Sequence, residues 1–460
     1  MSDATAAGCA SGDDLESLAG WGVEAALSAG AGEAEAWCER STSRRIRVYD
    51  GAVESLSDAG GRGIGIRAFL GERSGYGYGT DLTADGIRAT ARIALDAAAI
   101  ADPDEHGALP AEPGVADVEG LCSDAMAGWT TERKVELALA VERAARGRPG
   151  VSQVENAVYS DAEASAAIAN SRGFAAAYDA TRAFAYASAF AGEGEDLMTG
   201  LGIGLGRDPG ALDAAAIGHE AADRALALAG ARQPSSRRCP VVLDAFVAAS
   251  FAGLIGSMLS ADAVQRGRSL FAGREGEEVA EPALMLVDDG RHPDGPASAP
   301  FDGEGSATRR TPLIEGGHLR GFLYDTRTAR KDGRCSTANA SRSSYRAAPS
   351  VGTTNLLVEP GEAPLDELLR RAGEGLYVTD VAGLHSGVNP VSGTFSVGAC
   401  GRLIEGGELA GPVREITIAG DLVGMLRGVV AVGSGARWVP LGGSVRAAPL
   451  LIGEMAVSGS

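Results

Sequence analysis

The sequence predicts an α+β protein with two parts: an N-terminal α/β domain over residues 1–232 and a C-terminal, mainly-β domain over residues 233–460. Three observations lead to this prediction. The chain has 460 residues, which is more than one ordinary hydrophobic core holds. The order helix, alternating strands, helix occurs twice before about residue 230. From about residue 355 onward, short runs of alternating apolar residues dominate, separated by glycine-rich turns.

The first block of the N-terminal domain begins with a helix predicted over residues 13–29. Its apolar residues recur at helical spacing, and acidic residues occupy its first turn. Short antiparallel strands follow, and Asp50-Gly51 is a typical hairpin turn between two of them. A second helix, capped by Thr83, is predicted over residues 84–99. The strands of this block are predicted at residues 34–38, 45–49, 53–56, 63–69 and 74–78.

The same order recurs after a segment rich in proline, glycine and acidic residues, about 101–128, which we interpret as a linker. A helix capped by Thr130 or Thr131 runs to Arg146, and a last helix covers about residues 212–229. Two blocks of similar order indicate two related halves, each an antiparallel sheet with helices on one face. The strands of the second block are predicted at residues 151–160, 164–170, 174–190 and 197–205.

The C-terminal domain begins after the polar segment 232–238 with a short strand and an unusual helix over residues 245–259. This helix has no charged residue and consists largely of alanine, glycine and serine, so we expect close-packed neighbours to enclose it. Helices are also predicted over 365–372 and 421–427. The main strands are predicted at residues 239–243, 282–287, 355–358, 376–382, 395–404, 413–418, 428–432 and 449–452.

Two hairpins of the C-terminal domain share nearly one sequence, LIEGGHLRG at residues 313–321 and LIEGGELAG at residues 403–411. Adjacent glycines allow the positive φ angles of a tight turn. One interpretation is that two hairpins use the same turn chemistry. The other is an internal repeat that makes a pseudo-symmetric β domain.

Composition excludes several classes of partner. The formal net charge is −20, which disfavours nucleic acid because a phosphate backbone requires a compensating basic face. The longest apolar run, residues 245–259, is shorter than the roughly 20 residues of a membrane span, so no membrane is expected. The N-terminus lacks the features of a signal peptide. Six scattered cysteines without a CxxC pair indicate reduced thiols, and we expect a cytoplasmic protein.

Two histidine motifs suggest hydrolytic chemistry, but neither is complete. His219-Glu220 is superficially like the start of a zinc-peptidase helix, yet Asp223 occupies the position that a second histidine would need. His385-Ser386 offers a base and a nucleophile, but adjacent residues rarely face each other and no orienting acid is near in sequence. A loop that presents hydrogen bonds to a bound chain is favoured instead.

Residues 320–346 form a basic segment in an acidic chain, with seven basic residues and two acidic ones. One interpretation is a solvated loop whose cations pair with neighbouring acids. The other is a patch that holds carboxylates, such as the C-terminus of a peptide, because arginine can bind them through two parallel hydrogen bonds.

Four long strings of residues give the sequence a specific resemblance. In this order and combination they resemble the TldD/PmbA family of bacterial peptidases, peptidase family U62, and most closely its PmbA branch, which is also called TldE. The resemblance covers most of the chain from about residue 34. The strings are RVYDGAVESLS, PVVLDAFVAASFAGLIGSMLSADAVQRGRSLFAG, PFDGEGSATRRTPLIEGGHLRGFLYDTRTARK and GLHSGVNPVSGTFSVGACGRLIEGGELAGPVREITIAG.

The resemblance implies a PmbA/TldD-like fold and a cytosolic protein that acts on unfolded peptides, as a heterodimer with a TldD-type subunit or as a homodimer. In TldD, the helix that matches residues 245–259 carries the sequence His-Glu-x-x-x-His, and a cysteine near the C-terminus completes its zinc site. The corresponding positions here are Ala252, Gly253 and Ser257, none of which can ligate zinc. No cysteine lies around residues 438–441. We therefore expect no catalytic residue, metal or cofactor in this chain and zinc in a TldD-type partner.

We expect the chain to be the non-catalytic subunit of a TldD/TldE metallopeptidase complex that degrades or processes unfolded peptides. Two alternatives stay open. One is a stand-alone peptidase or amidase that uses either histidine motif, and the other is a non-enzymatic peptide-binding protein. The residues predicted to contact a peptide lie in loops 383–395 and 334–346 and are His385, Ser386, Asn389, Ser392, Arg342 and Arg346.

Overall fold

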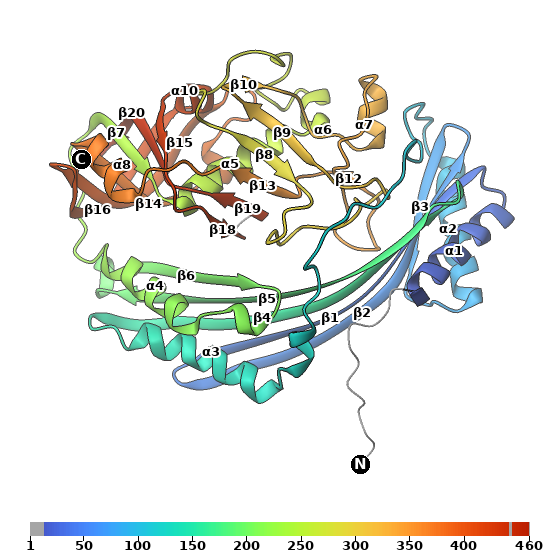
Figure 1. Ribbon diagram of the computed structural model, residues 1–460, viewed down its shortest axis with the longest axis horizontal. Coiled ribbons are helices and arrows are strands. Elements are labelled where there is room, and N and C mark those ends of the chain that lie inside the picture. Colours follow the sequence, from blue (N-terminus) through green and yellow to red (C-terminus); the bar gives the residue numbers. More distant parts are fainter. Residues whose placement is uncertain (1–12, 441–443, 460) are drawn as a thin grey trace.

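The computed structural model describes residues 13–440 and 444–459. A long, curved sheet forms the N-terminal part, and the C-terminal part lies on its concave face (Figure 1). The N-terminal elements are α1 (Asp13–Ser28), β1 (Glu33–Tyr49), β2 (Ala52–Leu70), β3 (Arg73–Gly79), α2 (Ala84–Ile100), η1 (Asp124–Gly128), α3 (Thr131–Arg146), β4 (Val151–Asn170), β5 (Ala175–Ala191), η2 (Gly194–Asp196), β6 (Met198–Gly206), η3 (Pro209–Ala211) and α4 (Ala214–Leu226).

A single antiparallel sheet runs through the whole N-terminal part, in the order β3-β2-β1-β4-β5-β6. The prediction of a separate sheet for each half is wrong, because β1 and β4, the first strands of the two halves, pair with each other from Glu35 to Val48. Each half has the order helix, three strands, helix. In each half, the first strand lies at the centre of the sheet, the second lies beside it and the third forms the edge.

Three strands of the N-terminal sheet are much longer than predicted. β1, β2 and β4 contain 17, 19 and 20 residues, and each one merges two predicted short strands. The joining residues include Ser41–Ser43 in β1 and Gly60-Gly61 in β2, which are partly or fully exposed. Periodicity did not reveal these stretches, because alternation of apolar residues arises only where one face of a strand is buried.

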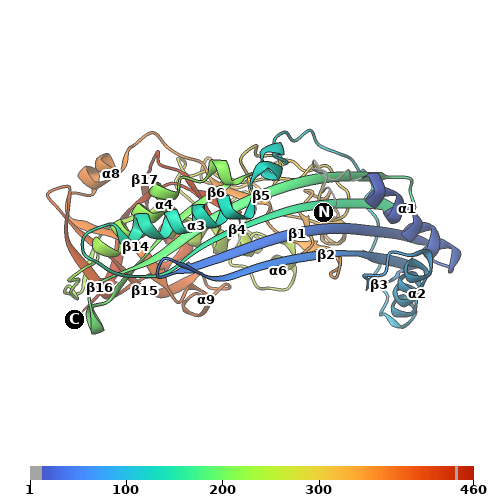
Figure 2. The ribbon, with the colours of Figure 1, turned by 90° about the horizontal axis from the view of Figure 1, so that it is seen from below.

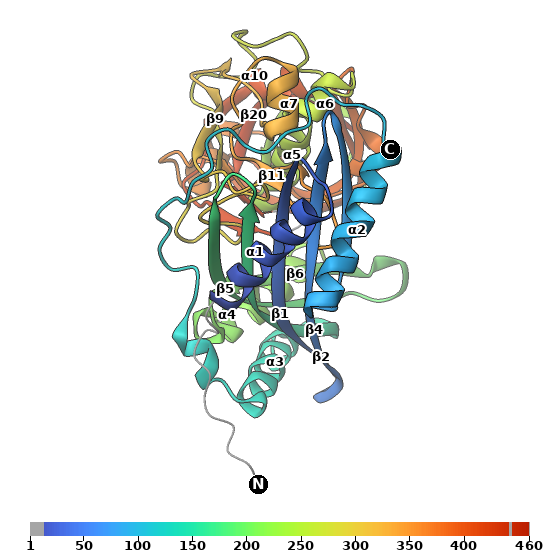
Figure 3. The same ribbon diagram turned by 90° about the vertical axis from the view of Figure 1, so that its right-hand side faces the viewer.

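The four long helices of the N-terminal part, α1 to α4, cover the convex face of the sheet (Figure 2). α1 and α2 lie side by side on one half (Figure 3), where they bury Ala36, Cys38, Ile64 and Ile66. α3 and α4 form an equivalent core over the other half of the sheet. The predicted N-caps Thr83 and Thr130 are confirmed, since each hydroxyl accepts a hydrogen bond from the backbone of the first helical turn.

Alternating glycines on the two edge strands let a helix lie directly against the sheet. A Cβ atom at Gly77 of β3 would lie 2.6 Å from the carbonyl oxygen of Thr90 in α2. A Cβ atom at Gly202 of β6 would lie 2.0 Å from the carbonyl oxygen of Ile217 in α4. Only glycine fits at such separations. The two halves therefore use the same packing device.

The C-terminal part is mainly β, as predicted. Its sheets have the orders β10-β9-β8-β13-β19-β18 and β16-β15-β14-β7-β20-β17, and β11 pairs with β12. An additional pairing of β16 with β20 closes the second sheet into a ring of five strands. The elements are β7 (Arg237–Leu243), α5 (Ala245–Met258), α6 (Ala261–Gln265), β8 (Leu286–Asp289), β9 (Arg310–Glu315), β10 (His318–Leu319), α7 (Thr326–Lys331), β11 (Ala340–Ser341), β12 (Ser350–Val351), β13 (Asn355–Val358), α8 (Leu365–Ala372), β14 (Gly375–Ala382), α9 (Leu384–Gly387), β15 (Thr394–Glu405), β16 (Glu408–Asp421), α10 (Leu422–Arg427), β17 (Val429–Val432), β18 (Arg437–Val439), β19 (Ser444–Ala447) and β20 (Leu450–Ser458).

The small residues of α5 allow this helix to lie between the two sheets. It contacts β13 and β19 of one sheet and β14 of the other. A Cβ atom at Gly256 would lie 2.7 Å from Leu356 Cδ2, so the neighbouring strand approaches too closely for a larger residue. The expectation that α5 is enclosed is confirmed, apart from one partly exposed stripe described below.

The two near-identical hairpins, β9–β10 and β15–β16, belong to different sheets, and the first strand of each pairs antiparallel with the strand that precedes it in the chain, β8 or β14. Their turns have the same backbone, with φ angles of 59° and 78° at Gly316 and Gly317 and of 59° and 82° at Gly406 and Gly407. The shared sequence therefore encodes the same turn, as the interpretation of shared turn chemistry expects.

Two expectations from composition can be compared with the described residues. None of the described helices is both long and apolar enough to span a membrane. Cys38, Cys239, Cys335 and Cys400 are free thiols. Cys122 is disulfide-bonded, which contradicts the expectation of a reduced thiol at this position. Spacing along the sequence could not show this bond, because it depends on proximity in space.

We predict that Gly202→Val lowers the free energy of unfolding by about 3 kcal/mol, because the added side chain would overlap the backbone of α4. Gly60→Val is the matched control, since a Cβ atom there would lie 3.9 Å from the nearest atom, the carbonyl oxygen of Ser41. The control should change stability by less than about 0.5 kcal/mol. Denaturant unfolding of both variants measures the difference, and equal effects would show that α4 does not need the glycine.

Candidate functional site

Helix α5 presents one partly exposed stripe, formed by Ser250, Gly253, Leu254 and Ser257. These residues recur every three or four positions, so they share one face of the helix. Ala252 lies on a buried face and is 4% exposed. Of the three positions that the resemblance matches to the His-Glu-x-x-x-His motif of TldD, two therefore open toward solvent and one is enclosed.

The stripe offers no side chain that suits a zinc ion. Ser257 Oγ donates a hydrogen bond to the carbonyl oxygen of Leu254 at 2.7 Å, and Gly253 has no side chain. Zinc in proteins is bound by imidazole, thiolate and carboxylate groups. Among the described residues, no cluster of three or more His, Cys, Asp and Glu side chains is placed to share a metal ion. The residues present on α5 thus do not fit the metal of a metallopeptidase.

A cavity of about 310 Å³ adjoins Ser250 at the boundary between the two parts of the chain. Arg224 of α4 spans this boundary, with Nη1 3.2 Å from Asp244 Oδ1 and Nη2 2.7 Å from the carbonyl oxygen of Thr379. The Tyr377 hydroxyl donates a hydrogen bond to Asp244 Oδ2 at 2.6 Å. Burial and the neighbouring carboxylate raise the pKa of Tyr377. These polar groups are engaged in fixing α4 and the start of α5.

The structure gathers four predicted peptide-contact residues, His385, Ser386, Asn389 and Ser392, in the exposed connection from β14 to β15, a loop that contains the short helix α9. Asn389 shapes the loop, because its Oδ1 accepts hydrogen bonds from the backbone N–H groups of Val391 and Ser392 at 2.9 and 3.1 Å. Ser386 Oγ donates to the carbonyl oxygen of Gly383 at 3.3 Å. A serine bonded in this way is not activated by its neighbour, and His385 is left exposed to solvent.

The two predicted contact regions do not come together. β14 and β15, which flank the loop of His385, lie at one end of the C-terminal part, whereas β12, beside the basic segment, lies toward the other end (Figure 1). Within that segment, Arg327 pairs with Asp104 and Arg334 with Glu275. For these two arginines, the interpretation of cations paired with acids elsewhere in the chain is confirmed.

Arg342 and Arg346 have different surroundings. Arg342 is almost fully buried: it pairs with Glu35 and donates to the carbonyl oxygen of Gly303 at 2.6 Å and to Tyr76 Oη at 3.1 Å. Each of its three guanidinium nitrogens is thus engaged within the chain. Arg346 is exposed and lies over the ring of Tyr345, 5.3 Å from its centroid, so it retains donors for a ligand.

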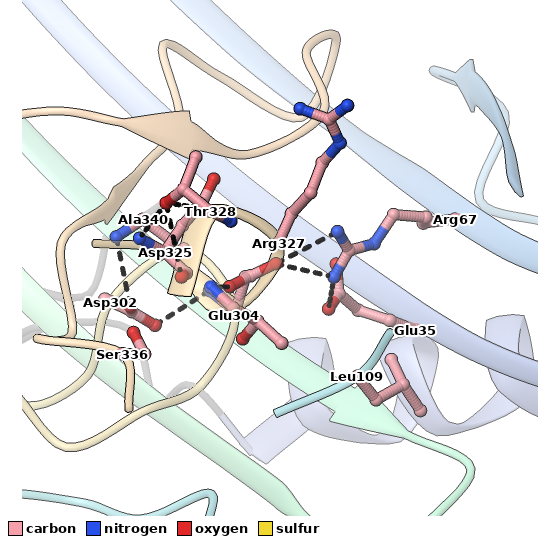
Figure 4. Close-up of polar contacts among 12 residues, drawn as sticks. Glu35, Arg67, Leu109, Asp302, Glu304, Asp325, Arg327, Thr328, Ser336 and Ala340 are labelled. Atoms are coloured by element: carbon pink, nitrogen blue, oxygen red, sulfur yellow. Dashed lines mark hydrogen bonds and ion pairs between the residues drawn. The ribbon is translucent and has the colours of Figure 1, made fainter. Parts of the chain in front are cut away.

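Arg342 belongs to a buried network of charges between the sheet and the C-terminal part. Figure 4 shows three other members of this network, Glu35, Arg67 and Glu304. Arg67 of β2 donates to Glu35 Oε2 at 2.8 Å and to Glu304 Oε1 at 3.0 Å. Glu304 also accepts a hydrogen bond from the backbone N–H of Thr326 at 2.9 Å. Two guanidinium groups and two carboxylates balance each other here, which is the condition under which buried charges are tolerated.

Asp302 and Asp325 lie beside Glu304 in the same region (Figure 4). Burial and the charge of Glu304 raise the pKa of Asp302 to about 7, and the same causes raise the pKa of Asp325. Raised carboxyl pKa values often mark catalytic sites. Here, however, Asp302 accepts three backbone hydrogen bonds, and Asp325 caps α7. Both carboxyls therefore hold loops in place.

The His219-Glu220 motif of α4 also serves the contact between the two parts. Glu220 binds Arg437 of β18 through two parallel hydrogen bonds, one of them 2.9 Å long, and accepts another from the backbone N–H of Ile203 at 3.3 Å. The carboxylate is therefore not free to act as a base beside His219. Sequence reasoning missed this role because Arg437 lies 217 positions away.

We predict that Glu35→Gln lowers the free energy of unfolding by about 3 kcal/mol, because the buried Arg342 would lose its ion-pair partner and Arg67 would keep only Glu304. Asp366→Asn, which removes the carboxylate of an exposed ion pair with Arg370, should leave the free energy of unfolding nearly unchanged. Denaturant unfolding of both variants checks the difference. Similar values for the two variants would show that the buried network does not hold the parts together.

Three family profiles match consecutive parts of the chain. PmbA/TldA metallopeptidase domain 1 matches residues 34–98, the central domain of that family matches residues 127–229, and its C-terminal domain matches residues 236–459. Together these matches cover well over half of the chain, and they leave unmatched most of the segment that the sequence indicated as a linker.

Individual relatives agree with these matches. Metalloprotease PmbA of Escherichia coli O157:H7 is 28% identical over 449 residues, 95% of each chain. A PmbA homolog of Haemophilus influenzae is 27% identical over 457 residues, 97% of this chain and 96% of the relative. The crystal structure of TldE from Thermococcus kodakarensis has the same fold, with a TM-score of 0.88 at 22% identity over 97% of this chain and 100% of that one. The chain therefore belongs to the PmbA/TldD family of metallopeptidases.

Proposed function

We propose that this chain is the non-catalytic, PmbA/TldE-type subunit of a cytoplasmic metallopeptidase complex that degrades or processes unfolded peptides. The carrying observation is the exposed stripe of α5, where Gly253 and Ser257 offer no metal ligand and Ala252 is buried. A metallopeptidase needs a metal to polarise the scissile carbonyl and to activate water. A TldD-type partner would supply that zinc ion, and this chain would help to bind the peptide.

Peptide contact is assigned to the loop of His385, together with the exposed Arg346. Both regions present polar side chains on a framework of strands, which is a common way to build a binding surface. Arg342 is assigned a positioning role, because its guanidinium nitrogens are already engaged. Asn389 shapes the loop through its backbone contacts, and the hydroxyl of the exposed Ser392 lies 2.8 Å from Thr394 Oγ1. The exposed His385 is available to a substrate.

The partner is assigned to the outer edge of β2. β3 pairs with β2 only from Ile64 to Leu70, so residues 52–62 have no strand on their outer side among the described residues. Val53 and Leu56, which are 42% and 44% exposed, lie on this stretch. An unpaired strand edge with exposed apolar side chains favours association with another chain.

We predict that Leu56→Asp prevents formation of the complex, because a charge would have to be buried at the contact. The variant should fold normally, since Leu56 is already partly exposed. Ile100→Asp is the matched control: Ile100 is 87% exposed at the end of α2 and should not affect association. Size-exclusion chromatography with a purified TldD-type protein measures complex formation. A stable complex with Leu56→Asp would place the partner elsewhere.

We predict that His385→Ala and Arg346→Ala reduce peptide cleavage by the reconstituted complex, mainly through a higher KM. Each substitution removes a side chain whose N–H groups would donate hydrogen bonds to the peptide. Loss of one such bond typically costs about 1 kcal/mol, or roughly fivefold in kcat/KM. Arg371→Ala, on the exposed side of α8, serves as the control. The assignment of substrate contacts is wrong if both variants cleave at the rate of the unchanged complex.

A further inference from the structure

A cleft of about 1000 Å³ lies between the concave face of the sheet and the C-terminal part. Residues of β5 and β6 line one side, and residues of β18, β19 and the loop 293–296 line the other. Ligand pockets commonly have volumes of roughly 300–1000 Å³, so this cleft has room for a short peptide or a large cofactor. None of the residues assigned above to peptide contact lines it.

Three arginines of the cleft, Arg182, Arg207 and Arg446, form no ion pair with any of the described residues. Arg207 Nη2 donates to the carbonyl oxygen of Gly295 at 2.8 Å. Its Nη1 is buried and has no hydrogen-bond partner within the described ranges. Burial and the neighbouring charge of Arg182 lower the pKa of Arg207. A buried donor without a partner, beside a second cation, is a favourable place for an anion.

The acidic residues that line the cleft form no ion pair with these three arginines in the described structure. Asp208 is engaged by two hydrogen bonds, from Ser123 Oγ and from the backbone N–H of Gly210, both at 2.7 Å. Asp294 attracts Arg207 but forms no ion pair with it, and Glu119 is exposed at the rim. The fourth arginine of the cleft, Arg437, is already paired with Glu220 of α4.

An apolar wall lies close to the arginines. Phe184 and Leu205 contribute from the sheet and Trp438 from β18, and the ring of His292 stands edge-on to Trp438 with 5.2 Å between centroids. An occupant that uses both surfaces must combine an anionic group with an apolar body. Arginine recognises the planar carboxylate through parallel hydrogen bonds, and the wall suits an aromatic or aliphatic side chain.

We propose that this cleft binds the free C-terminal carboxylate of a peptide that ends in an apolar residue, with Arg182 and Arg207 as its anion ligands and Phe184 and Trp438 beside its last side chain. The inference deepens the proposed function by adding an anchor point for one end of the substrate. The inference concerns peptide binding by the isolated chain, whereas the proposed function concerns peptide cleavage by the complex. The two are measured separately, so a negative result for one leaves the other in place.

Isothermal titration calorimetry with two probes tests the proposal: the peptide acetyl-Ala-Ala-Phe with a free carboxylate, and the same peptide with a C-terminal amide. The free acid should bind at least tenfold more tightly, since hydrogen bonds to a charged group contribute about 1.5–3 kcal/mol. Arg207→Gln and Arg182→Gln should each weaken binding of the acid about tenfold and leave the amide unchanged. Arg266→Gln, at an exposed ion pair with Asp262, is the control.

Three results would overturn the proposal: equal affinity for acid and amide, no binding of either probe, or unchanged binding of the acid by both arginine variants. Displacement of the peptide by inorganic phosphate at a comparable concentration would assign the cleft to small anions instead. Circular dichroism establishes that each variant is folded. If Arg207→Gln does not fold, the test rests on Arg182→Gln, because Arg182 is exposed and its substitution should not disturb the fold.

Discussion

The buried network of Glu35, Arg67, Arg342 and Glu304 is the interaction on which the relation between the two parts of the chain depends. Two of its members belong to the long sheet and two to the C-terminal part. Because the charges are removed from water, each one is tolerated only while its partners stay in place. The network therefore opposes sliding of the C-terminal part over the concave face, which small and exposed residues cover in its middle.

Near the opposite end of the sheet, other ion pairs make the corresponding connection. Glu220 with Arg437 and Arg224 with Asp244 join α4 to elements of the C-terminal part. The two parts therefore touch at both ends of the sheet, and a large cleft and a smaller cavity lie along their boundary. Their walls come from both parts, so the same charged contacts that stabilise the fold also define the shape of a binding surface.

The sequence predicted most helices and the mainly-β C-terminal part, since capping threonines and apolar periodicity are local signals. It did not predict that β1, β2 and β4 are continuous, because the small and polar residues in their middles carry no apolar alternation. The burial of Arg342 was also not predictable, since its partner Glu35 lies 307 positions away. By contrast, the replaced ligand positions on α5 were visible directly, because the chemistry of zinc binding depends on residue type.

The central claim is that hydrolysis by this system requires a metal held by another chain. The most direct test measures bound zinc and peptidase activity in the purified chain alone, in a TldD-type protein alone, and in their mixture. The account predicts no stoichiometric zinc and no activity in this chain alone, with both present in the mixture. Stoichiometric zinc together with chelator-sensitive peptide cleavage by this chain alone would contradict the account.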